Sequence, residues 1–157
     1  MLSSFLLHVI ADYLIVPIVF AGGLALLLVP KQRRYQVWAR ALLAGLVALL
    51  LAKLISLLYQ QGHRPFEMLG VEPGAAFLPN PGFPSDHALL VFVVTFVTWA
   101  STKNVKLSVI LLLGSIAVSI GRVIALVHTP VDVLGGFVCA FLAVLCVYGR
   151  QFFTPRR

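Results

Sequence analysis

The sequence predicts an all-α protein, a polytopic membrane helical bundle of about five transmembrane helices, with six as the alternative. First, its 157 residues are 61% hydrophobic and only 11% charged, whereas soluble domains carry about a quarter charged residues. Second, the apolar residues gather in runs near the roughly 20 residues of a spanning helix. Third, these runs are apolar on every side, whereas strands of a membrane barrel alternate apolar and polar residues. We therefore expect residues 1–157 to form a single integral-membrane domain.

Five apolar runs are predicted to cross the membrane. The first two cover about 9–29 and 41–59, and the third, 87–100, needs a few flanking residues to reach spanning length. The last two cover 107–125 and 131–149 and are separated by a short break. No basic residue precedes the first run and no small-residue cleavage site follows it, so the first run is predicted to be a span rather than a signal peptide.

The basic residues predict the orientation of the chain. Most of them lie in the first loop, the third loop and the tail: Lys31, Arg33, Arg34, Arg40, Lys103, Lys106, Arg150, Arg156 and Arg157. With five spans these regions share one side, which the positive-inside rule makes cytoplasmic. This distribution accounts for the net charge of +7 without nucleic acid as a partner. Lys53, Arg64 and Arg122 remain unexplained by the rule, and charges in or beside spans are usually functional.

The stretch "VHTPVD" before the last run combines a helix start with a histidine. Pro130 suits the first turn of a helix, Thr129 the N-cap and Asp132 the third position, where a carboxylate closes a capping box. His128, just before the cap, can reach toward Asp132. A carboxylate on one imidazole nitrogen fixes the tautomer and leaves the other nitrogen free as a nucleophile or base.

The stretch "PSDH" is a second helix start. With five spans, it and "VHTPVD" both lie on the outer face of the membrane, opposite the basic loops. Ser85 can cap the third span, and His87 lies in its first turn. Two helix N-termini supply unpaired N–H groups and partial positive charge, and the guanidinium forks of Arg64 and Arg122 match phosphate oxygens. The residues therefore predict a phosphate ligand, phosphoryl transfer to His128 and protonation of the leaving oxygen by His87.

Lys53 and Asp12 are weaker candidates. On an unbroken helix Lys53 shares a face with Arg64 but lies roughly 16 Å deeper along the axis. A lysine can extend several ångströms toward the interface, so a phosphate contact from Lys53 stays open beside simple snorkelling. Asp12 is interpreted as an interfacial residue at the outer end of the first span and not as part of a site.

These residues resemble the type 2 phosphatidic acid phosphatase (PAP2) family of membrane phosphatases. The family motifs are Lys-x6-Arg-Pro, Pro-Ser-x-His and Ser-Arg-x5-His-x3-Asp, and this chain has "RPF" at 64–66, "PSDH" at 84–87 and "GRVIALVHTPVD" at 121–132. In two places the chain departs from them. Leu57 stands where the family has its lysine, with Lys53 one turn deeper, and Gly121 replaces the serine before the arginine.

The resemblance implies a role for each matched residue. His128 would be the nucleophile that becomes phosphorylated, Asp132 would orient it, and His87 would be the general acid. It implies no metal and no other cofactor. The positions that hold phosphate oxygens would be Arg64, Arg122, Ser85 and, in place of the missing lysine, Lys53.

The resemblance also implies a substrate and a location. "FPSDHA" with "HRPF" is similar to the branch that converts undecaprenyl diphosphate to undecaprenyl phosphate, which implies a bacterial inner membrane and a site facing the periplasm or cell exterior. Phosphatidic acid or phosphatidylglycerol phosphate is the alternative substrate. A lipid-phosphate-binding membrane protein without catalysis, and transfer to an acceptor other than water, stay open as alternative functions. Besides substrate and membrane lipids the sequence indicates no partner, and it leaves the oligomeric state open.

Overall fold

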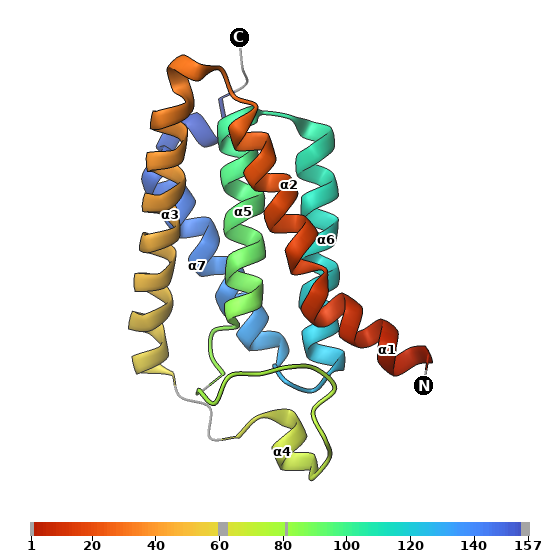
Figure 1. The fold of residues 1–157 in the computed structure, drawn as a ribbon. Coiled ribbons are helices and arrows are strands. Elements are labelled where there is room, and N and C mark those ends of the chain that lie inside the picture. Colours follow the sequence, from red (N-terminus) through yellow and green to blue (C-terminus); the bar gives the residue numbers. More distant parts are fainter. Residues whose placement is uncertain (1, 60–62, 81, 155–157) are drawn as a thin grey trace.

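The structure, a computed structural model, describes residues 2–59, 63–80 and 82–154. Within these ranges it is all-helical and contains no strand, which confirms the predicted fold class. Figure 1 shows an upright bundle with one helix, α5, among the others. The elements in chain order are α1 (Leu2–His8), a π-helical turn η1 (Val9–Tyr13), α2 (Ile15–Leu27), α3 (Lys31–Leu58), α4 (Pro65–Leu69), α5 (Asp86–Thr102), α6 (Val105–Ile124), α7 (Pro130–Tyr148) and a 3-10 turn η2 (Gly149–Phe152).

Four of the described helices are long and apolar enough to cross a membrane: Phe5–Leu27, Lys31–Leu58, Val105–Ile124 and Pro130–Phe152. They correspond to four of the five predicted spans. The fifth, α5, has 17 residues and falls short of that length. Most of its side chains are buried against α2, α3, α6 and α7, so α5 contributes the core of the bundle and is enclosed by protein rather than lipid.

The second span begins earlier than predicted. Helix α3 starts at Lys31, ten residues before the predicted start at 41. The basic residues of 31–40 interrupt the apolar pattern, but lysine, arginine and glutamine are good helix formers, so the helix continues through them. The apolar pattern therefore locates the lipid-crossing part and misses the polar extension.

The two ends of the bundle differ in charge. The turns before α3 and after α5 lie at the same end as the last turns of α7, and α4 lies at the other end (Figure 1). Most of the predicted cytoplasmic basic residues are thus gathered at the end opposite α4. Arg156 and Arg157, which belong to the same prediction, lie outside the described residues.

The helix starts of α5 and α7 are built as predicted and lie against each other. Ser85 Oγ accepts a hydrogen bond from Ala88 N at 3.5 Å, and Thr129 and Asp132 form a capping box at α7. The backbone N–H of Ser85 donates to Asp132 O at 3.0 Å. A Cβ on Gly136 would lie 2.8 Å from Ser85 O, so only glycine permits this approach of α7 to α5. The two helix N-termini are therefore held side by side.

Candidate active site

Four of the predicted catalytic and phosphate-binding residues meet at the α4 end of the bundle. Arg64, His87, Arg122 and His128 line one cavity of about 250 Å³, although they come from four separate segments. The loop between α4 and α5, called the outer loop below, completes the wall with Ala76, Phe77, Leu78 and Asn80. Asp86, at the start of α5, also lines the cavity. Tertiary structure thus brings two histidines and two arginines to one space large enough for a phosphate group.

His128 and Asp132 form the predicted pair across the first turn of α7. His128 Nδ1 lies 3.5 Å from Asp132 Oδ2, a close approach that falls short of a hydrogen bond, and both side chains are buried. Asp132 Oδ2 accepts from the backbone N–H of Thr129 at 2.6 Å, which holds the carboxylate in place. With Nδ1 turned to Asp132, Nε2 is the nitrogen left for chemistry.

The environment of His128 favours its neutral form. Burial lowers the pKa of the His128 imidazole below its usual value, and Arg122 and Arg64 add to this, while the nearby Asp132 carboxylate acts in the opposite direction. A histidine acts as a nucleophile only when its attacking nitrogen carries no proton. The pKa shift therefore favours the neutral imidazole of His128, which keeps one ring nitrogen unprotonated.

Arg64 ties the outer loop to the turn that carries His128. Its Nη1 donates to Val127 O at 2.6 Å, and its Nη2 donates to Leu78 O at 2.9 Å and to Asn80 Oδ1 at 2.7 Å. The guanidinium carbon also lies 5.2 Å from the centre of the Phe77 ring. These acceptors are neutral, so the positive charge of Arg64 at the cavity wall is not cancelled by them.

Arg122 has an acidic partner that the sequence analysis does not assign to the site. Its Nη1 donates to Asp12 Oδ1 at 2.6 Å, with Arg122 1% exposed and Asp12 14% exposed. The interpretation of Asp12 as an interfacial residue outside any site therefore misses this contact. Its signal in the sequence is a carboxylate inside an apolar run, and ionisable residues within membrane segments usually have partners. Spacing alone gives no indication that this partner is Arg122.

Asn80 is a second residue that sequence reasoning misses. Its Oδ1 accepts from Arg64 and from the backbone N–H of Gly82, and its Nδ2 donates to Asp86 Oδ2 at 3.2 Å. Asn80 therefore joins the arginine to the carboxylate at the start of α5. An asparagine in a loop rich in proline and glycine is typical of a turn, so no pattern distinguishes it.

Ser85 and Lys53 do not line the cavity. Ser85 is fully buried, and its hydroxyl is directed to the backbone of α5 as the N-cap. Lys53 lies in a neighbouring recess of about 50 Å³, which shares Asn80 and Asp86 with the cavity. The two residues thus flank the site rather than form its wall in this arrangement.

The arrangement can bind an anion and supply a nucleophile. Two guanidinium groups supply donors for anion oxygens, with Arg122 paired to Asp12 and Asp86 on the same wall, and the imidazoles of His128 and His87 face the same space. Among residues 2–59, 63–80 and 82–154, no group of three or more His, Cys, Asp or Glu side chains is placed to hold a metal ion.

Comparison with known proteins gives a family match and one relative. The family model of the PAP2 superfamily matches residues 69–155, which include His87, Arg122, His128 and Asp132. The bacitracin transport permease protein BcrC of Bacillus licheniformis is 32% identical over 109 residues, which are 69% of this chain and 52% of that protein. The chain thus spans about half the length of this curated relative. No solved structure matches the chain significantly.

Proposed function

Because the chain belongs to the PAP2 superfamily, we propose that it is a membrane lipid phosphatase that acts through a phosphohistidine on His128. The observation that carries the proposal is the cavity in which the His128–Asp132 pair meets Arg64, Arg122 and His87. A protein that only binds lipid phosphates needs the cations, whereas an oriented and neutral imidazole beside them serves a reaction.

The proposed reaction has two steps. In the first, His128 Nε2 attacks phosphorus, the bond from phosphorus to the leaving oxygen breaks, and His87 protonates that oxygen. In the second, water attacks the phosphohistidine, the N–P bond breaks, and inorganic phosphate is released as His87 takes up the proton. Arg122 and Arg64 stabilise the charge on the equatorial oxygens in both steps.

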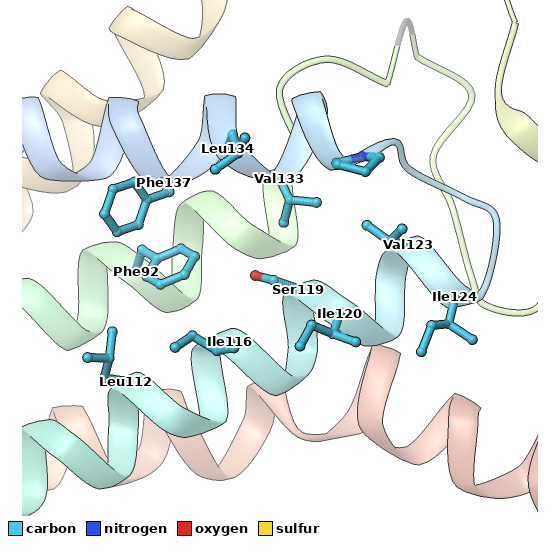
Figure 2. A pocket seen from close by; sticks show the side chains of 11 residues that line it. Phe92, Leu112, Ile116, Ser119, Ile120, Val123, Ile124, Val133, Leu134 and Phe137 are labelled. Carbon is cyan, nitrogen blue, oxygen red and sulfur yellow. The ribbon is translucent and has the colours of Figure 1, made fainter.

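An apolar groove supports a lipid as the substrate. It measures about 520 Å³ and opens between α6 and α7 (Figure 2). Phe92, Leu112, Ile116 and Phe137 line its deep part, and its wall is otherwise almost entirely aliphatic. Ile124 and Pro130 at its outer part border the turn that carries His128. A hydrocarbon tail in this groove would leave its phosphate near the cavity.

Undecaprenyl diphosphate is the substrate that we place first, because the "PSDH" and "HRPF" stretches resemble that branch of the family. Phosphatidic acid and phosphatidylglycerol phosphate are the alternatives of the same chemistry. The name of the relative BcrC describes transport. A membrane protein that binds lipid phosphates without cleaving them is therefore the alternative that is not an enzyme. Transfer of the phosphoryl group to an acceptor other than water is the third alternative.

We further propose that the site faces the periplasm or cell exterior of a bacterial inner membrane. The basic residues at the opposite end of the bundle support this orientation by the positive-inside rule. A site at that interface reaches lipid headgroups exposed on the outer leaflet.

The purified protein in detergent is expected to release phosphate from undecaprenyl diphosphate in the presence of excess EDTA. The physical reason is that the nucleophile and the charge stabilisation come from side chains of the cavity. Released phosphate and the lipid product are measured together, with phosphatidic acid and phosphatidylglycerol phosphate assayed in parallel. Loss of lipid phosphate without free phosphate would indicate another acceptor. Binding of all three lipids without cleavage would contradict the enzyme.

Filling the groove is expected to affect long lipids selectively. Ile116→Trp should lower kcat/KM for undecaprenyl diphosphate by about tenfold or more, since each buried methylene contributes ~0.8 kcal/mol of binding. The same variant should change kcat/KM for geranyl diphosphate, which has a short tail, by less than about twofold, because that tail would not reach Ile116. Leu113→Trp, on the exposed side of α6 outside the groove, is the matched control. Equal losses on the two substrates would contradict a tail in this groove.

A further inference from the structure

We propose that Asp12, in the N-terminal segment, is a positioning residue that holds Arg122 in the geometry that binds phosphate. The inference rests on the proposed function, because it concerns the same phosphate site. It assigns a part in that site to a segment that lies outside residues 69–155, the range that the family model matches.

The ion pair of Asp12 with Arg122 is deeply buried on the arginine side. Arg122 Nη1 donates to Asp12 Oδ1 at 2.6 Å, and Arg122 Nε is buried without a hydrogen-bond partner among the described residues. A buried guanidinium that loses its carboxylate partner is strongly destabilised and rearranges toward other acceptors. Asp12 is thus the group that directs the Arg122 fork while the same arginine lines the cavity beside His87 and His128.

The second carboxylate oxygen of Asp12 contacts the cavity wall. Oδ2 accepts from the backbone N–H of Ala76 at 3.0 Å, and Ala76 lines the cavity. The same loop is also attached to the turn after α6, because Gly74 N donates to Ala125 O at 2.9 Å. The carboxylate that binds Arg122 is thus itself held in place by the loop at the cavity wall.

Gly121 lies where η1 packs tightly on α6. A Cβ at Gly121 would lie 3.1 Å from Ile10 Cγ2 and 3.2 Å from Ala11 Cα, closer than ordinary van der Waals contact. Gly121 stands where the PAP2 motif has serine, so the departure from the motif coincides with the approach of η1 to α6. Asp12 itself lies in that π-helical turn, closed by Leu14 N to Val9 O at 2.9 Å. Segments of this kind are frequent at functional sites.

A double-mutant cycle tests the proposal. Asp12→Ala is expected to lower kcat/KM about 100-fold through misplacement of a phosphate contact. The double variant Asp12→Ala/Arg122→Ala should be as active, within about threefold, as Arg122→Ala alone, since Asp12 acts through Arg122.

His8→Ala is the matched control, because exposed His8 contacts the same carboxylate at 3.4 Å through Oδ2, the oxygen that does not bind Arg122. It should retain activity within about twofold of the wild type. Losses that add in the double variant would overturn the proposal.

Two further variants keep the test decisive. If Asp12→Ala does not fold, Asp12→Asn keeps the shape of the side chain and removes its charge. Asp12→Asn should lower kcat/KM in the wild-type background and cause no further loss in the Arg122→Ala background. Gly121→Ser should separate η1 from α6 and lower kcat/KM in wild-type protein by about tenfold, but by less than about threefold beside Asp12→Ala. A Gly121→Ser loss of the same size in both backgrounds would show that the close approach does not act through Asp12.

The assay separates failure of this proposal from failure of the proposed function. If the wild type cleaves no lipid phosphate, the phosphatase proposal fails, and binding of inorganic phosphate by calorimetry replaces kcat/KM. Asp12→Ala should then weaken phosphate binding about tenfold in the presence of Arg122 and leave the Arg122→Ala protein unchanged. Phosphate affinity that is the same with and without Asp12, in an active or inactive protein, would overturn the positioning role.

Discussion

His128→Ala is expected to lower turnover by about 10⁴-fold or more, because the variant has no nitrogen that can attack phosphorus. Substrate binding should change little, since the charge that attracts the phosphate comes from Arg64 and Arg122. The measurement is phosphate release under saturating undecaprenyl diphosphate, with binding measured separately on the same preparation. Alkaline quenching of a reaction with undecaprenyl diphosphate radiolabelled in its terminal phosphate should trap a labelled protein in the wild type and none in the variant, because the N–P bond of a phosphohistidine survives in base and is hydrolysed in acid.

The matched control for this loss is His63→Ala. His63 lies one residue before Arg64, its side chain is 75% exposed, and it does not line the cavity. Activity of this variant should stay within about twofold of the wild type. Turnover by His128→Ala at the wild-type rate would contradict the mechanism, whatever the substrate.

Asp132→Asn is expected to have the second-largest effect, a fall in kcat of about 10³- to 10⁴-fold, by analogy with other histidines that lose an orienting carboxylate. An amide can present N–H to His128 Nδ1, which favours the tautomer with the proton on Nε2, where the attack must occur. KM should change little. The variant also loses the negative charge that opposes lowering of the His128 pKa, so that pKa should fall further.

A control variant separates orientation of His128 from helix capping. Glu67→Gln alters the carboxylate that accepts from a backbone N–H at the start of α4, as Asp132→Asn does at the start of α7, and Glu67 does not line the cavity. A cap effect would lower the thermal stability of both proteins by similar amounts, of order 1 kcal/mol. The large loss of kcat should appear in Asp132→Asn alone. Equal losses of kcat in both variants would contradict the orienting role.

Much of the site can be predicted because it depends on local chemistry. Ser85 and Thr129 begin helices for reasons contained within four residues, and the His128–Asp132 spacing places both side chains on one turn. The positive-inside rule leaves Arg64 and Arg122 unexplained, and this exception alone makes them candidates for a function. The helix starts and the histidine–aspartate pair depend on hydrogen bonding and helix period, and neither needs the neighbouring helices.

The residues that sequence reasoning misses have distant partners or ordinary surroundings. The predicted start of α3 is ten residues late because the basic residues of 31–40 interrupt the apolar pattern without ending the helix. Asp12 stays outside the predicted site because its partner is 110 positions away in sequence. Asn80 is not distinguished because turn residues are common in such loops. A phosphate contact from Lys53 is open from sequence, and the structure places Lys53 in a recess beside the cavity rather than in it.

Side-chain hydrophobicity and backbone hydrogen bonds that close within a turn are enough to specify the helical membrane architecture and the two capped helix starts. They also identify the histidines and arginines that gather at one end of the bundle. The pairing of charges, in contrast, follows only from tertiary packing. Glycine contacts bring η1 onto α6 and α7 onto α5, and only then does Asp12 meet Arg122 and Asp132 O meet Ser85 N. The approach of α7 to α5 depends on the absence of a side chain at Gly136, and a side chain at Gly121 would crowd η1. No local pattern indicates which segment will pack against either glycine.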